Sequence, residues 1–319
     1  MSNEKIWSFF IYLSNHMWDD EFCSSRAPYL APKYKECNEI DVGVWDRTMQ
    51  FLAERKYNMV IVDVGDGIKF ESHPEICAPD AWDKDILKKK LDEMRALGLE
   101  PIPKLNFSCA HNTWMKKYRR MVSTPEYYQF ASDVIREVCE VFGNPRFIHL
   151  GLDEERAGIT DFREALHVRG TELWWHDAYL LFAEAEKNGA RPWVWSDYFW
   201  NHPDIFAERM PKSVLQSNWC YSLMKFKHSE GSRRPTMFAT YEKLNELGYD
   251  QVPCGSLCEG ACVNLFQTLS YTKDRLTDDL VKGFLVVPWQ RTEPEAEYTL
   301  YDNAHRLYVA RQKLYPETL

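Results

Sequence analysis

Short apolar runs alternate with longer amphipathic segments along the whole chain. The short runs are rich in β-branched and aromatic residues, which favours buried strands, and the longer segments repeat apolar residues at helical spacing. The pattern predicts strands over residues 6–13, 58–65, 99–107, 146–151, 191–199, 213–219, 250–255 and 284–289. It predicts helices between them, for example over 45–56, 85–98, 127–143 and 174–189. Several of these segments end in a glycine, as helices often do: Gly98, Gly143, Gly189 and Gly248.

Eight repeats of strand and helix indicate an α/β protein with a parallel sheet. The chain has 319 residues, somewhat more than the roughly 250 that are typical of a (β/α)₈ barrel. No stretch rich in proline, glycine and serine divides it. We therefore predict a single (β/α)₈ TIM barrel that forms one domain over residues 1–319.

Composition and charge exclude several classes of protein. The formal net charge of -9 disfavours nucleic acid as a partner, because phosphate binding needs a basic face. No segment approaches the roughly 20 apolar residues of a membrane span, so we expect no membrane contact. The run over 6–13 lacks the basic region and cleavage site of a signal peptide, so we interpret it as the first strand of a cytoplasmic protein. A homo-oligomer is compatible with the sequence.

The nine cysteines are scattered along the chain, and in a protein without an export signal we expect reduced thiols. Cys254, Cys258 and Cys262 have a spacing that suits one helix face, but no histidine or fourth cysteine lies at a usual zinc spacing. We therefore predict neither a metal site nor a cofactor.

Polar and aromatic residues gather where the predicted strands end, which is where barrels of this kind place their active sites. In chain order they are Asn15, His16, Trp18, Asp63, Asp66, Asn106, His111, Asp153, Glu154, Trp195, Asp197, Tyr198, Asn218, Trp219, Tyr221, Trp289 and Glu293. The 12 Trp, 17 Tyr and 17 Phe residues can fill a large core, or some of them can line a cleft that stacks on a ligand. Because carboxylates, amides and indoles converge on one mouth, we expect a binding pocket there.

The fourth strand runs into "HLGLDEE", residues 149–155, which ends in three adjacent carboxylates. Alternation along a strand would put His149 and Asp153 on the inward face. Glu154 reaches the mouth only if the backbone leaves the strand there. Two carboxyl groups in one desolvated pocket would then take different pKa values, as an acid and a stabilising anion require. In the structural alternative, Asp153 caps the next helix and Glu154 is solvated; His149 either hydrogen-bonds within the barrel or holds the pair in place.

The segment "HLGLDE" resembles the His-x-Gly-Gly-Asp-Glu signature of glycoside hydrolase family 20, the β-N-acetylhexosaminidases. The stretch "VDVGDGIKFESHPEI" (62–76) is similar to the loop after that family's second strand, and 85–111 is similar to its helix and third strand. The stretch "GYDQV" (248–252) resembles its approach to strand seven. The resemblance is good over about residues 58–155 and thinner afterwards.

This resemblance implies retaining hydrolysis assisted by the 2-acetamido group of the substrate, which is an exception to the usual two-carboxylate scheme. Glu154 would protonate the leaving oxygen, and Asp153 would stabilise the oxazoline-type intermediate. Trp195, Trp219 and Trp289 would wall the sugar pocket, and Glu293 would accept hydrogen bonds from outer hydroxyls. The remaining candidates for carbohydrate binding are Asp66, Asn106, His111, His149, Tyr198 and Tyr221.

Four features depart from the family pattern. The arginine after strand one is missing, with Arg26 as a candidate replacement, and the tyrosine and aspartate after strand seven have no counterpart. Lys104 and Asn106 stand where the family has two carboxylates, and we expect the barrel to lack the small domain that usually precedes it in the family. Alternative hypotheses are a sugar-binding or degenerate barrel, a glycosidase for another sugar, and a metal-dependent barrel that uses Asp63, Asp66, His111 and Asp153.

Overall fold

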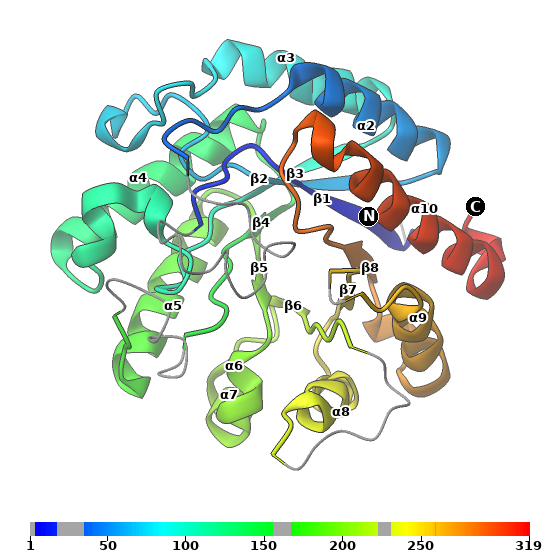
Figure 1. Cartoon of the computed structure of the whole chain (residues 1–319). Coiled ribbons are helices and arrows are strands. Elements are labelled where there is room, and N and C mark those ends of the chain that lie inside the picture. The colour runs from blue at the N-terminus through cyan, green and yellow to red at the C-terminus, as the bar shows by residue number, and fades with distance from the viewer. Residues whose placement is uncertain (1–3, 18–34, 156–166, 223–230, 259) are drawn as a thin grey trace.

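The eight apolar runs form eight parallel strands that curl into a nearly closed barrel in the computed structural model (Figure 1). The structure describes residues 4–17, 35–155, 167–222, 231–258 and 260–319. The strands are β1 (Ile6–Tyr12), β2 (Met59–Asp63), β3 (Glu100–Lys104), β4 (Phe147–His149), β5 (Arg191–Trp195), β6 (Leu215–Ser217), β7 (Cys254–Gly255) and β8 (Gly283–Val286). The predicted (β/α)₈ TIM barrel is therefore confirmed.

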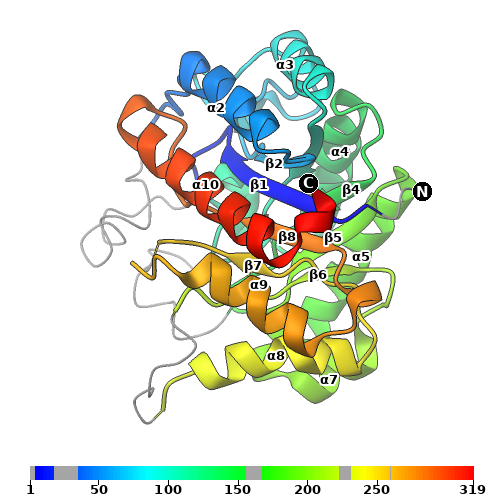
Figure 2. The ribbon, with the colours of Figure 1, turned by 90° about the vertical axis from the view of Figure 1, so that its right-hand side faces the viewer.

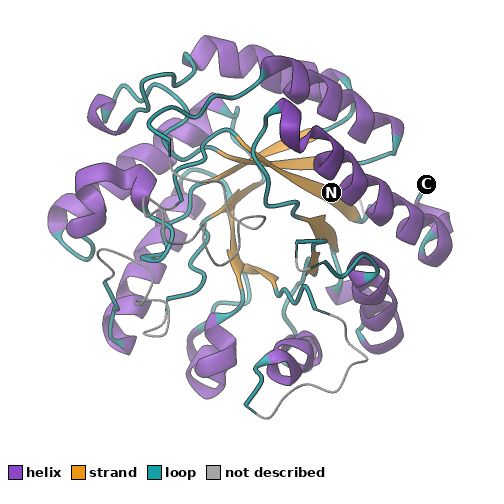
Figure 3. Ribbon diagram, viewed as in Figure 1, coloured by secondary structure: helices purple, strands orange, loops and turns teal. Residues whose placement is uncertain are grey.

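Helices surround the strands on the outside (Figure 3). They are α2 (Val42–Glu54), α3 (Lys84–Ala96), α4 (Pro125–Val141), α5 (Thr171–Lys187), α6 (Tyr198–Asn201), α7 (Pro203–Arg209), α8 (Arg234–Glu246), α9 (Asn264–Arg275) and α10 (Glu297–Leu314). Short 3₁₀ turns add η1 (Pro74–Ile76), η2 (Thr113–Arg120), η4 (Asp278–Leu280), η5 (Pro294–Ala296) and η6 (Pro316–Thr318). The C-terminal helix α10 lies between α2 and α9 (Figure 2). None of the helices described here is long and apolar enough to cross a membrane.

Strand order around the sheet is β6-β5-β4-β3-β2-β1-β8-β7, with every pair parallel. The remaining seam, between β6 and β7, is closed by three backbone hydrogen bonds: Gln216 N–H to Asp250 O, Val252 N–H to Gln216 O and Cys254 N–H to Asn218 O, at 3.1, 2.8 and 2.9 Å. All eight carboxyl ends therefore point to the same mouth, which is what brings distant segments together.

Alternation along the strands sorts the apolar side chains into two layers. On β1, Phe10 and Tyr12 face the barrel interior, and Phe9 and Ile11 pack against the helices. The layer between strands and helices holds most of the buried residues, and the interior is a smaller cluster rich in aromatic rings. Each strand differs from its predicted range by one or more residues. β8, for example, begins one residue earlier than predicted, at Gly283, where a Cβ would lie 1.9 Å from the carbonyl oxygen of Ile6 on β1 and only glycine fits.

Candidate active site

The backbone leaves the extended conformation directly after β4, which ends at His149. Gly151, Leu152 and Glu154 have positive φ angles of 73°, 66° and 59°. Glycine is required at position 151, because a Cβ there would lie 1.9 Å from the side-chain oxygen of Asn106. Strand alternation therefore stops short of Asp153, and the turn brings both carboxyl groups of the pair into the mouth.

Asp153 is buried, and both of its carboxylate oxygens have partners from the loop after β3. Asn106 donates its amide N–H to Oδ1 at 3.0 Å, and His111 Nε2 lies 3.1 Å from Oδ2. The hydroxyl of Ser108 donates to the backbone carbonyl of Asp153. Helix α5 begins later, after Gly170 as its N-cap. Asp153 thus serves a buried polar site and does not cap α5.

Glu154 lies beside this anion but is more open to solvent, with 26% of its side chain exposed. Its Oε2 is 3.3 Å from the same Nε2 atom of His111. Burial opposes the charge on His111, but Asp153 and Glu154 together raise its pKa to about 9. Burial would also raise the pKa of Asp153, but the charges of His111 and Lys104 and the Asn106 bond lower it to about 2. At neutral pH the site holds an imidazolium and an ionised aspartate.

A third carboxyl group, Asp197, contacts the pair from the end of β5. Its Oδ2 accepts the backbone N–H of Glu154 at 2.7 Å. Burial, followed by the charge of Asp153, raises the pKa of Asp197 to about 8. The sequence placed Asp197 at the mouth, but nothing in the pattern of residues pointed to this bond.

Glu155, the last carboxylate of the run, points away from the pair into a buried ion network. Arg169 contacts it through two nitrogens, and the Nη1 atom of Arg169 lies 2.9 Å from Asp177 Oδ2 on α5. All three side chains are almost fully buried. Glu155 therefore fastens the loop after β4 to α5.

Four of the predicted aromatic residues meet at the inner mouth of the barrel. Trp219 and Tyr221 stack with ring centroids 5.1 Å apart, and Tyr221 lies 6.4 Å from Trp289. The rings of Trp195 and Trp289 are 6.2 Å apart. Tyr198 lies elsewhere: its ring stacks on Trp174 of α5 at 4.0 Å, in the layer between strands and helices.

A few buried polar side chains also lie inside the barrel. His149 is fully buried, contacts the ring of Trp195 at 4.5 Å and accepts the Gly151 N–H at Nδ1, so it supports the turn after β4. Burial and the charge of Lys104 hold its pKa well below the ordinary value, so it is neutral. Lys104 is buried inside the barrel and pairs with Asp63 at 2.5 Å.

Two more of the predicted residues, besides Tyr198, lie away from the aromatic group. Asp66 is buried and pairs with His16 at 2.7 Å and with Lys116 at 3.1 Å, which ties together the loops after β1, β2 and β3. Glu293 is half-buried and lines a surface depression beside the segment 35–41. Trp18 and Arg26 lie outside the described residues.

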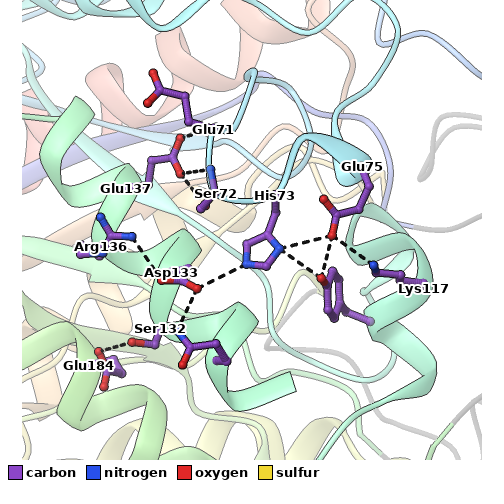
Figure 4. Close-up of polar contacts among 12 residues, drawn as sticks. Glu71, Ser72, His73, Glu75, Lys117, Ser132, Asp133, Arg136, Glu137 and Glu184 are labelled. Carbon is purple, nitrogen blue, oxygen red and sulfur yellow. Dashed lines mark hydrogen bonds and ion pairs between the residues drawn. The ribbon is translucent and has the colours of Figure 1, made fainter. Parts of the chain in front are cut away.

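A further polar cluster, outside the barrel, joins the loop after β2 to α4 (Figure 4). His73 lies between Asp133, at 3.6 Å, and Glu75, at 3.3 Å. Glu137, nearly buried, accepts the backbone N–H groups of residues 71 and 72 and pairs with Lys84 at 2.7 Å. These contacts hold the loop that follows β2 against α4.

The carboxylates proposed for a metal-dependent barrel are each paired with a lysine or histidine side chain. Asp63 pairs with Lys104, Asp66 with His16, and Asp153 with His111. Among the described residues, no group of three or more histidine, cysteine, aspartate and glutamate side chains is arranged to hold a metal ion.

No protein-family model and no curated protein matches the chain, but many solved structures share its fold. The exo-β-N-acetylglucosaminidase of Vibrio harveyi, solved in complex with N-acetylglucosamine, aligns with 99% of this chain at 12% identity and a TM-score of 0.63. The β-N-acetylhexosaminidases of Bacteroides fragilis (12% identity, TM-score 0.60) and Streptomyces plicatus (14%, 0.60) each align with 98% of it.

The fold is that of the glycoside hydrolase family 20 barrel. The resemblance first seen in the fourth-strand signature is thereby confirmed for the architecture of the whole chain. The chain spans 57% of the length of the Vibrio structure, 71% of the Bacteroides one and 68% of the Streptomyces one, in line with a match to the catalytic barrel only.

Proposed function

We propose that the chain is a glycoside hydrolase that cleaves a terminal 2-acetamido sugar with retention of configuration. One observation carries the proposal: two adjacent carboxyl groups at the end of β4 share the Nε2 atom of His111, one buried and the other partly open to solvent. The similarity of the fold to β-N-acetylhexosaminidases supports the same reading.

In the proposed reaction Glu154 is the general acid. It gives its proton to the glycosidic oxygen, and the bond between that oxygen and the anomeric carbon breaks as the substrate's acetamido oxygen attacks the same carbon. Asp153, ionised at neutral pH, stabilises the positive charge that develops on the acetamido nitrogen. Water then opens the oxazoline-type ring and returns a proton to Glu154. His111, with a proton at Nε2 within 3.3 Å of Glu154, orients both carboxyl groups.

The aromatic group of Trp195, Trp219, Tyr221 and Trp289 supplies flat apolar faces of the kind that pack against a sugar ring. Since Tyr198 faces α5, Tyr221 is the tyrosine that we assign to the acetamido oxygen. Its hydroxyl lies 3.8 Å from Cys254 Sγ, a weak partner that a ligand oxygen can replace.

A panel of 4-nitrophenyl glycosides with and without a 2-acetamido group tests the proposal. We expect turnover of acetamido substrates alone, and a loss of about 10²–10⁴-fold in Glu154→Gln, as for other general acids. The loss should be much smaller for a 2,4-dinitrophenyl leaving group, which hardly needs protonation. The exposed Glu140→Gln variant is the control. Sugar binding without turnover of any glycoside would support the binding-protein alternative instead.

A further inference from the structure

Asp197 occupies the N-cap position of α6, yet its side chain makes no capping hydrogen bond to that helix. An aspartate in this position usually accepts an N–H from the first helical turn. Here Oδ2 accepts instead the backbone N–H of Glu154, 43 residues earlier in the chain, at 2.7 Å. Asp197 is 6% exposed, so the bond is shielded from water.

The residue that receives this bond has a strained backbone. Glu154 has a φ angle of 59°, in the left-handed region, which is unfavourable for a residue with a Cβ. Such a conformation persists only where the surroundings impose it. Without Asp197 the N–H of Glu154 would lose this acceptor, and relaxation of φ would move the carboxyl group away from His111.

Burying a third carboxyl group, that of Asp197, beside Asp153 and Glu154 is energetically unfavourable, which suggests that Asp197 has a specific role there. Asp197 faces the charges of Asp153 and Glu154, and burial together with Asp153 raises its pKa to about 8. At neutral pH it is therefore a neutral acid, whose carbonyl oxygen can accept the N–H. Its other oxygen, Oδ1, is buried and has no hydrogen-bonding partner among the residues described. An aspartate on the surface would avoid this desolvation cost, so a buried aspartate at this position needs a structural reason.

We propose that Asp197 is a positioning residue, which holds the backbone of Glu154 so that the acid faces the leaving group. This inference rests on the proposed function of Glu154. The acceptor oxygen is what matters, and the amide of asparagine offers the same oxygen in the same place. Alanine offers no acceptor, and leucine keeps the volume without one.

The test compares Asp197→Ala, Asp197→Leu and Asp197→Asn on 4-nitrophenyl and 2,4-dinitrophenyl 2-acetamido glycosides. We expect the alanine and leucine variants to lose about 10²-fold in kcat on the poorer leaving group, as for small misplacements of a catalytic group. They should lose little on the better one, with KM nearly unchanged. Asparagine should recover most of the loss. Asp204→Ala, an exposed carboxyl on α7, is the matched control.

A double variant separates positioning from structural support. In a Glu154→Gln background, Asp197→Ala should cause no further loss, because the group that it positions is already gone. Equal losses on both leaving groups, an added loss in the double variant, or unfolding of both the alanine and the leucine variant would overturn the inference. If Glu154→Gln itself fails to distinguish the leaving groups, the proposed function fails whatever Asp197 does.

Discussion

The imidazole of His111 and the carboxylate of Asp153 form a buried ion pair, with Nε2 and Oδ2 3.1 Å apart. The histidine comes from the loop after β3 and the aspartate from the loop after β4. The pair therefore connects the ends of β3 and β4. Because both groups titrate, the strength of the ion pair depends on pH.

Replacing His111 by asparagine should destabilise the protein by about 3–5 kcal/mol, because it leaves a buried carboxylate without its cation. The pKa of His111 is raised from 6.5 to about 9, so its contribution is complete below pH 6.5 and is lost as the pH rises through 9. The pKa of Asp153 is lowered from 3.8 to about 2, so its contribution is complete above pH 3.8 and is lost as the pH falls through 2. Urea unfolding of both proteins at pH 5, 7 and 9.5 measures this. A difference that does not change with pH would contradict the ion pair.

Replacing Asp153 by asparagine should slow 2-acetamido substrates severely, because a neutral amide cannot balance the developing positive charge. A thiazoline analogue of the bicyclic intermediate should bind the parent protein more tightly than the free sugar does, as transition-state-like ligands do. Isothermal titration of both ligands, with kinetics of the variant, measures these effects. Weak thiazoline binding together with equal cleavage of 2-hydroxy glycosides would point to an ordinary acid and nucleophile.

Gly151→Ala should reduce both stability and kcat, whereas Gly189→Ala should reduce stability alone, by about 1 kcal/mol. The two glycines have similar φ angles, 73° and 77°, so the backbone cost is matched. They differ in surroundings: a Cβ at position 151 would meet Asn106, and one at 189 meets nothing within 4 Å. Thermal melting and kcat of the two variants test this. Equal activity in both would mean that Asn106 can move without disturbing Asp153.

Arg169→Met should cost about 3–5 kcal/mol, because Glu155 and Asp177 would then be buried without a cation. The control is Arg146→Met, whose pair with Glu100 is half exposed and should contribute about 1 kcal/mol or less. Chemical denaturation of the two variants gives the comparison. Similar losses in both would show that water reaches the Arg169 network.

The fold was predictable because periodicity alone distinguishes eight buried strands from the helices between them. The ends of the strands were harder to predict from the sequence. The run over 250–255 predicts a longer strand than the observed Cys254–Gly255. Earlier in that run, Gln251 forms only isolated bridges, to Gln216 of β6 and to Val281. The mouth residues follow from the strand ends, and most of the aromatic ones do meet there.

Side-chain directions at the mouth were harder to predict. Alternation from His149 to Asp153 assumes that the strand continues, but the sign of φ after β4 is set by the packing of Gly151 on Asn106. The hydrogen bond between Asp197 and Glu154 joins the ends of two neighbouring strands, and the local sequence around either residue gives no sign of it. Tyr198 faces α5 because a short helix starts at that residue and turns its ring outward.

The loop after β4 cannot be treated as a portable module. Asn106 and Ser108 hold Asp153, Asp197 holds Glu154, and Arg169 holds Glu155. Grafting residues 150–155 onto another barrel would transfer the carboxyl groups without the atoms that aim them. The smallest piece that could be transplanted is the sector from β3 to β5 with its connecting loops. Chimeric barrels whose crossover points lie within this sector should fold with the carboxyl groups of the site displaced. Chimeras that exchange the whole sector should keep these carboxyl groups in place.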